Sequence, residues 1–205
     1  MNIRQTTQEI VGGPYRYALF YNFPGGLRFA LSAGGSPLDQ ALTTLRKATV
    51  ICDDVFDGEQ EILVHLEACA PASRFGLRKM LRELCIAGLV IPKNRDFWLE
   101  AEDQADDGNE DVYWVGCAFE VPAAKLQNLL WSTVTADFGS SLRPNPRCRV
   151  YLFNRNKEIV VHPYDDRGMD VISRRKSVLK GLYERHHDLL LDYDIEAMRR
   201  TFAQS

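Results

Sequence analysis

The sequence predicts an α+β fold, an α/β sandwich in which helices pack on a mixed, mainly antiparallel sheet. Three observations predict it. Strand-like and helix-like segments roughly alternate, the strand-like segments of 148–173 follow one another through short turns, and no linker divides the chain into two cores. A length of 205 residues also fits one domain. We therefore expect a single domain over residues 1–205.

The expected strands are short apolar segments, rich in β-branched and aromatic residues and bounded by Gly, Pro or Asp. In chain order they are 27–32, 61–68, 89–92, 96–100, 112–121, 148–154, 158–164 and 169–173. The segment 112–121 is the clearest of them, because it is apolar on both faces. The segments 148–154 and 158–164 are expected to form a hairpin through the turn 155–157.

The expected helices carry apolar residues at three- and four-residue spacing, which is the period of an amphipathic helix. In chain order they are 1–11, 37–56, 73–87, 122–138, 174–191 and 195–202. Ser36 and Pro37 suit the N-cap and the first position of the second helix. Gly88 is placed to end the third helix. The first helix, 1–11, has little in its sequence to fix it.

Composition and charge favour a globular protein and argue against several classes of partner. Hydrophobic residues make up 45% of the chain and charged residues 26%, as in soluble globular domains. The net charge is −3: residues 1–111 carry 11 Lys and Arg against 17 Asp and Glu (−6), and residues 112–205 carry 14 against 11 (+3). Neither half has the basic balance of a nucleic-acid-binding domain. No apolar run approaches the roughly 20 residues that span a membrane.

The cysteines and the N-terminal segment both predict a cytoplasmic protein. Cys52, Cys69, Cys85, Cys117 and Cys148 are far apart and form no C-x-x-C pair. An odd number of distant cysteines argues against a disulfide framework or a zinc site, so we expect reduced, buried thiols. The N-terminal segment lacks the apolar core of a secretion signal. No phosphate-binding glycine motif occurs in the chain, and no cofactor is expected.

The run HPYDDRGMD near the C-terminus lies between two strand-like segments and is rich in polar side chains. Its candidate binding residues are His162, Tyr164, Asp165, Asp166, Arg167 and Asp170. As a structural element, it is a β-turn in which an aspartate bonds the backbone two residues on and Gly168 takes positive φ. Arg167 then pairs with Asp170 or Asp166. As a functional element, it is a recognition surface, or a metal or catalytic centre built from the histidine and the three aspartates.

The segment 100–111 carries seven acidic residues and no apolar residue larger than alanine, which predicts a solvated loop. Its candidate contact residues are Asp103, Asp106, Asp107 and Glu110. A dense carboxylate cluster steers association with cationic surfaces. Two interpretations therefore stand for this segment, a solvated insertion between strands and a surface for a basic partner.

The C-terminal part of the chain resembles a known family. The string YLFN…EIVVHPYDDRGMDVIS…LYERHHDLLLDYD, within about 148–203, is similar to the signature of the bacterial domain of unknown function 3885. His187 and Leu189 depart from that pattern, in which asparagine and tryptophan are usual. The resemblance extends more weakly upstream through LFYNFPGGLRFALS. It implies no assigned enzymatic activity, and small proteins of this kind often stand beside polymorphic toxins as immunity proteins.

Two functions follow as expectations. The first is a non-enzymatic binding protein, an immunity protein whose partner is a cognate bacterial toxin. The acidic segment and the HPYDDRGMD run would then be its contacts, in a complex burying on the order of 1,600 Å². The alternative is a small metal-dependent hydrolase centred on the same run. That alternative requires His162 and the three carboxylates to converge on one point.

Overall fold

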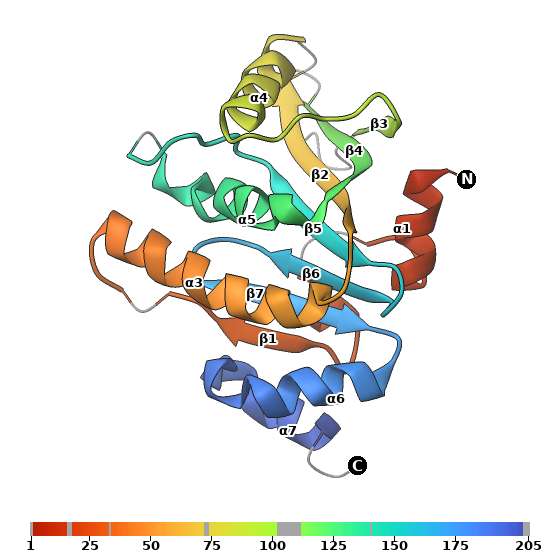
Figure 1. Ribbon diagram of the computed structural model, residues 1–205, viewed down its shortest axis with the longest axis vertical. Helices are drawn as coiled ribbons and strands as arrows, with labels where there is room; N and C mark the ends of the chain where they lie inside the picture. The colour runs from red at the N-terminus through yellow and green to blue at the C-terminus, as the bar shows by residue number, and fades with distance from the viewer. Residues whose placement is uncertain are drawn as a thin grey trace.

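The computed structural model describes residues 2–15, 18–32, 34–71, 74–101, 112–139 and 141–202. Its centre is one open sheet of seven strands in the order β1-β7-β6-β5-β2-β4-β3. Each neighbouring pair in this sheet is antiparallel. Helices lie against both faces of the sheet (Figure 1). The predicted α+β class with a mainly antiparallel sheet is therefore confirmed.

The strands follow the expected segments closely. They are β1 (Leu27–Ala30), β2 (Glu61–Pro71), β3 (Arg95–Ala101), β4 (Val112–Pro122), β5 (Arg149–Asn154), β6 (Ile159–Pro163) and β7 (Gly168–Ser173). The strands β1 and β3 form the two edges of the sheet. The register places Arg28 of β1 opposite Asp170 of β7, and Asp170 opposite His162 of β6. Three polar residues therefore lie side by side across neighbouring strands.

The described residues form seven α-helices and four 3₁₀ turns. The α-helices are α1 (Ile3–Val11), α2 (Leu19–Asn22), α3 (Pro37–Phe56), α4 (Arg74–Ile86), α5 (Leu126–Val134), α6 (Lys176–Arg185) and α7 (Ile195–Phe202). The 3₁₀ turns are η1 (Ala123–Lys125), η2 (Ala136–Phe138), η3 (His187–Leu189) and η4 (Asp192–Asp194). Ser36 caps α3 as predicted, in a reciprocal capping box with Asp39. Across the described chain, no helix combines the length and apolarity that crossing a membrane requires.

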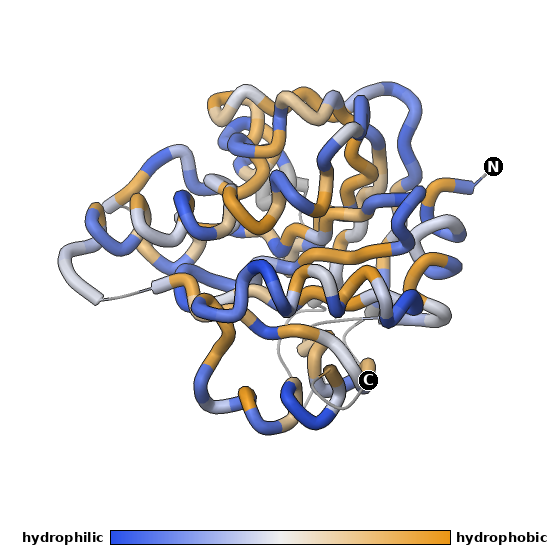
Figure 2. Tube along the Cα trace, turned by 60° about the horizontal axis from the view of Figure 1, so that its bottom comes forward, coloured by the Kyte–Doolittle hydropathy of each residue, from blue (hydrophilic) through white to orange (hydrophobic). Residues whose placement is uncertain are grey.

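The sheet has a mainly apolar face and a face that mixes apolar and polar side chains. The main core lies on the first face, beneath α3, α4, α5, α6 and α7. A smaller core lies on the other face, where α1 covers Leu63, Tyr151 and Phe153. In Figure 2 hydrophobic and hydrophilic residues alternate along the helices, as expected of helices that bury one side. The buried polar row, formed by Arg28, Asp170 and His162, therefore lies on the face that α1 covers.

Two expected elements differ in the structure. The predicted helix 174–191 is wrong in its C-terminal third, since α6 ends at Arg185 and a 3₁₀ turn follows. The cause is tertiary: His186 Nε2 bonds Asp54 of α3 at 2.7 Å, and Leu190 forms a β-bridge with Phe29. The predicted strand 89–92 is a connection instead. Its first N–H bonds back to the carbonyl of Leu84 and helps to end α4.

The cysteine expectation holds for three of the five thiols. Cys52, Cys117 and Cys148 are buried, whereas Cys69 and Cys85 are exposed. Burial raises the pKa of the Cys117 thiol to about 11. Burial also raises the pKa of the Cys52 and Cys148 thiols. The buried thiols are therefore uncharged core groups.

Candidate functional site

The HPYDDRGMD run forms the end of β6, a tight turn and the start of β7. Asp165 closes the turn, because its Oδ1 accepts hydrogen bonds from the backbone N–H groups of Arg167 (2.7 Å) and Gly168 (3.2 Å). This is the predicted aspartate-to-backbone bond two residues on. The backbone N–H of Tyr164 also donates to the Gly168 carbonyl at 3.2 Å. The turn is thus held by its own hydrogen bonds.

The ion-pair partner predicted for Arg167 is wrong. Its guanidinium pairs with Asp165, with Nε donating to Oδ2 at 2.8 Å. Asp165 already holds the Arg167 backbone, so its second oxygen lies within reach of the same residue's side chain. Asp170 points into the protein and is fully buried, and Asp166 carries no bond to Arg167 among those the structure describes. The Arg167 side chain itself is 77% exposed.

The positive φ predicted for Gly168 is also wrong, since Gly168 begins strand β7 and is absent from the described glycines with positive φ. Glycine stands here for reasons of space. A Cβ at this position would lie 1.9 Å from the Tyr164 hydroxyl and 3.0 Å from the Phe29 carbonyl oxygen. The missing side chain therefore lets the Tyr164 ring fold back over the start of β7.

Asp170 forms a buried ion pair with Arg28 of β1. Its Oδ1 accepts from Arg28 Nε at 2.8 Å, and its Oδ2 accepts from Arg28 Nη2 at 3.3 Å. The backbone N–H of Phe20 donates to the same carboxylate at 3.1 Å. A second carboxylate, Asp194, lies 3.3 Å from Arg28 Nη1. Such a pair is stable in the interior only because its remaining hydrogen-bonding groups are satisfied.

Aromatic rings enclose the Arg28 guanidinium. Its central carbon lies 4.4 Å from the ring centre of Tyr21, 5.2 Å from that of Tyr164 and 5.3 Å from that of Phe20. These distances fit cation–π attraction. Although burial lowers the pKa of Arg28, its bonds to Asp170 raise that pKa above the ordinary value. Arg28 is therefore a permanent buried cation, fixed by two carboxylates and three rings.

His162 lies beside this pair on β6 and is 1% exposed. Its Nδ1 lies 2.9 Å from the Val150 carbonyl oxygen, which makes Nδ1–H the donor. Its ring stacks on Tyr151 of β5, with centroids 4.1 Å apart and an interplanar angle of 15°. Burial lowers the pKa of His162 to about 4. The imidazole is therefore neutral at pH 7.

The ring stack continues across the sheet beyond Tyr151. His65 of β2 stacks on Tyr151 at 5.2 Å, and Trp98 of β3 lies 4.8 Å from His65. The Arg4 guanidinium covers the outer face of Trp98 at 4.5 Å. Gly116 makes this possible, because a Cβ there would lie 2.1 Å from the Trp98 indole. Four strands thus contribute rings to one stacked row.

A cavity of about 150 Å³ lies at the α1 end of this row. Among its lining side chains are Tyr15, His65, Glu67, Trp98 and Glu100. The Tyr15 hydroxyl bonds His65 Nδ1 at 2.9 Å, whereas no described residue bonds the buried Nε2. Burial lowers the pKa of His65 to about 3, so this histidine is neutral. A cavity of this size with polar walls suits ordered water or a very small polar ligand.

Residues 4–194 match the family described as Domain of unknown function (DUF3885). The chain belongs to this family. The match runs from α1 to the end of η4, so it covers far more than the C-terminal signature that suggested the family. No curated protein and no solved structure gave a significant match to the chain. Family membership thus accounts for the sequence signature and assigns no activity.

The predicted site residues of this DUF3885 member do not converge on one point. His162 bonds a backbone carbonyl, Asp165 closes the turn and Asp170 pairs with Arg28. The Asp166 carbonyl accepts from Thr44 at 2.6 Å, and burial, together with Asp165, raises the pKa of its carboxyl group. Within the described ranges, no group of three or more His, Cys, Asp or Glu is placed to hold a metal ion. The arrangement orders a turn and a buried ion pair.

The acidic segment of this family member lies largely outside the described residues. Asp103, Asp106, Asp107 and Glu110 all fall within 102–111, which the structure does not describe. Glu100, at the start of the predicted loop, belongs to β3 and pairs with Arg4 of α1. The predicted loop is therefore wrong at its first two residues, 100 and 101, which belong to β3.

Sequence reasoning missed the residues that complete the site. They are Arg4, Tyr15, Tyr21, Arg28, His65, Trp98 and Tyr151. One signal was available: an arginine at position 28 stands within the apolar strand LRFA, where a charge needs a buried partner. The ring row carried no such signal, because its members lie on four strands far apart in the sequence.

Proposed function

We propose that this protein is a non-enzymatic binding protein of the bacterial cytoplasm, an immunity protein that neutralises a cognate toxin. The observation that carries the proposal is an exposed apolar surface at the β3 edge of the sheet. We define the β3 edge surface by Phe97 and Leu99, two exposed residues on one side of β3; Leu81, Ile86 and Val90 of α4 and the connection after it are also exposed. These elements lie together at one end of the molecule (Figure 1).

The β3 edge surface has the character of a protein-docking site. Phe97 and Leu99 are 51% and 61% exposed, and they lie on one side of an edge strand that pairs with β4 alone in the described sheet. Proteins normally protect such edges, because an unpaired strand with apolar side chains recruits other chains. A partner protein that covers this edge would bury both the side chains and the free backbone groups.

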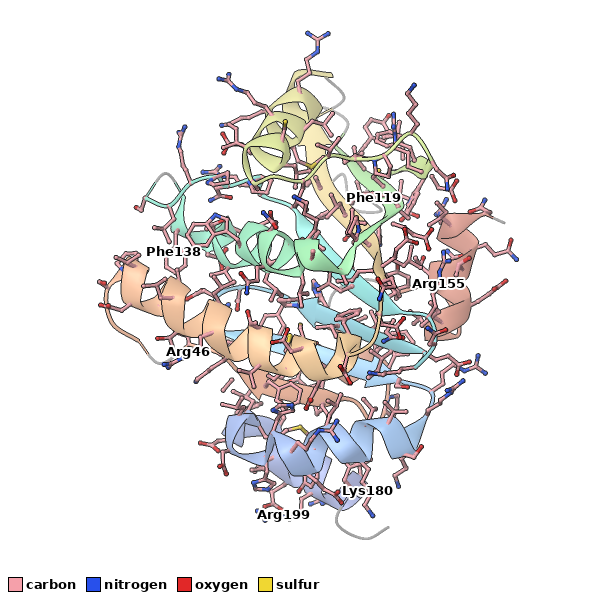
Figure 3. All side chains as sticks on the ribbon, in the orientation of Figure 1. Arg46, Phe119, Phe138, Arg155, Lys180 and Arg199 are labelled. Carbon is pink, nitrogen blue, oxygen red and sulfur yellow. The ribbon has the colours of Figure 1, made fainter. Side chains whose placement is uncertain are left out.

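Charge supports the same end of the molecule. The segment 102–111 follows β3 directly in sequence, and its six carboxylates would attract a basic toxin surface. Lys180 and Arg199, in contrast, project from α6 and α7 at the opposite end (Figure 3). Residues 74–95 add six basic residues and one acidic residue to the β3 end, so the attraction for a basic partner rests on the carboxylates of 102–111.

The HPYDDRGMD run takes a smaller part in this proposal than its composition suggests. His162, Asp165, Asp166 and Asp170 are buried, so they support the turn rather than touch a partner. Arg167 is the exposed member of the run and the one suited to direct contact. The hydrolase alternative receives less support, since its four residues bond separate neighbours.

The proposal is tested by co-expressing the protein with the product of the neighbouring gene. We expect co-purification of a roughly 1:1 complex and protection of the cell from that product's toxicity. The double variant Phe97→Asp/Leu99→Asp should abolish both, because two carboxylates would face an apolar partner surface. The matched control is Leu38→Asp/Leu42→Asp on α3, whose two leucines are each 53% exposed.

Folding of each variant is checked by its thermal melting curve. Loss of binding and protection in the β3 double variant, with both retained in the α3 control, supports the proposal. The proposal fails if the neighbouring gene product neither binds nor harms cells. It also fails if the β3 variant protects as well as the wild-type chain.

A further inference from the structure

A second cavity, of about 570 Å³, lies away from the candidate site and from the β3 edge surface. Its walls come from the C-terminal part of α1, the 23–26 connection, β6 and the end of β7. The start of α6 and the end of α7 complete them. The volume falls in the range of small-molecule sites in proteins.

The walls of this cavity are mainly apolar. Its apolar side chains include Ile10, Val11, Phe23, Val160, Ile172 and Leu179. The connection on one side lies close against β7, since a Cβ on Gly26 would come within 2.9 Å of the Ile172 side chain. The backbone of Gly25, with φ +90°, completes the bend beside it. These contacts hold the wall in place without filling the cavity.

The charged groups at the cavity have one sign. Of the described residues that line it, the two charged ones are Arg174 and Lys176, at the start of α6. The N-terminus of α6 has no side-chain cap and no acidic residue in its first turn. Its first N–H groups and the helix dipole therefore add to the positive potential. Arg174 also lies alongside Gly12, at the C-terminal end of α1.

We propose that this cavity binds a small amphipathic anion, free in solution, with an apolar body and one carboxylate. The apolar body occupies the space between α1 and the C-terminal helices, where its burial supplies most of the binding free energy. The carboxylate lies at the rim, where Arg174 and Lys176 offer charge-assisted hydrogen bonds. This site is independent of the proposed toxin binding, because it shares no residue with the β3 edge surface.

The test uses the full chain and two probes of equal length, octanoate and 1-octanol, in isothermal titration calorimetry. We expect octanoate to bind one site and to bind about tenfold more tightly than 1-octanol, which lacks the charge. The double variant Arg174→Gln/Lys176→Gln should remove this difference and leave 1-octanol binding unchanged. The matched control, Arg199→Gln/Arg200→Gln on α7, removes two cations that do not line the cavity.

A third variant tests the apolar part of the site. Thr201→Trp places a large side chain at the wall and should abolish binding of both probes. The proposal is overturned if octanoate does not bind, or if its affinity is the same in the Arg174/Lys176 variant and the wild type. Binding that persists in Thr201→Trp also overturns it. Co-sedimentation with phosphatidylglycerol vesicles would overturn the commitment to a free ligand.

Discussion

At the residue scale, Arg28 shows how strongly the buried polar row depends on complete pairing. Its side chain is 12% exposed and its partner Asp170 is fully buried, so neither charge is well solvated. The pair is stable because each partner has further contacts. A backbone N–H group donates to Asp170, and a second carboxylate and three aromatic rings contact Arg28. The pair between Arg167 and the buried Asp165 differs, since the Arg167 side chain is 77% exposed and water solvates its guanidinium. The two ion pairs use carboxylates that lie five residues apart in the sequence, Asp165 and Asp170, yet they differ greatly in energetic weight.

The variant Arg28→Met should be strongly destabilised, because it leaves the Asp170 carboxylate buried without its cation. We expect the free energy of unfolding to fall by about 3–5 kcal/mol. The control Arg167→Gln removes an exposed cation and should cost less than about 1 kcal/mol. Urea unfolding of both variants measures the difference. Equal losses in the two variants would contradict the role given to the buried pair.

The neutral histidines His65 and His162 predict acid sensitivity. Their folded-state pKa values of about 3 and about 4 lie below the unfolded value of about 6.5. Between these values the unfolded chain binds protons that the folded chain does not, so stability falls as pH falls below about 6.5. In His65→Gln, the slope of unfolding free energy between about pH 6 and 4.5 should decrease by about 1.4 kcal/mol per pH unit. A slope that stays as steep in His65→Gln as in the wild-type chain would refute the assignment.

At the scale of elements, local sequence signals predict a segment well when local bonds also hold it in the structure. The helix α3 begins as predicted, because the Ser36 cap and Pro37 act within its first turn. The extent of α6 is not predictable in this way. Its apolar spacing continues past Arg185, yet the bond from His186 to Asp54 and the bridge at Leu190 turn the chain away. Those partners lie more than a hundred residues away in the sequence.

The same distinction between local and long-range bonds applies to the candidate site. The Asp165 turn was predictable, because its bonds join residues two and three apart. The Arg28 partner of Asp170 was not, since sheet order brings β1 beside β7 across 142 positions of sequence. The sequence also predicts the wrong reason for the glycine at 168, positive φ instead of close packing. Its need for space arises from the Tyr164 ring, whose position depends on Arg28.

At the scale of the whole molecule, one continuous sheet joins the two ends of the protein. The β3 end carries the exposed apolar surface, and the other end carries α6 and α7 with the larger cavity. The central strands β2, β5 and β6 connect them through one ladder of hydrogen bonds and one main core. If the chain is a single domain, as its sequence predicts, a destabilising change at one end should lower the stability of the other end as well.

The variant Leu182→Ala tests that expectation. Leu182 lies on α6 and is 1% exposed, so its truncation should lower the free energy of unfolding by about 2–5 kcal/mol. The three tryptophans, Trp98, Trp114 and Trp131, lie on β3, β4 and α5, away from the substitution. In a single cooperative unit, tryptophan fluorescence and far-ultraviolet circular dichroism should therefore shift to lower urea together. If the C-terminal helices unfolded as a separate unit, circular dichroism alone would shift, and the tryptophan transition would stay where it is in the wild-type chain.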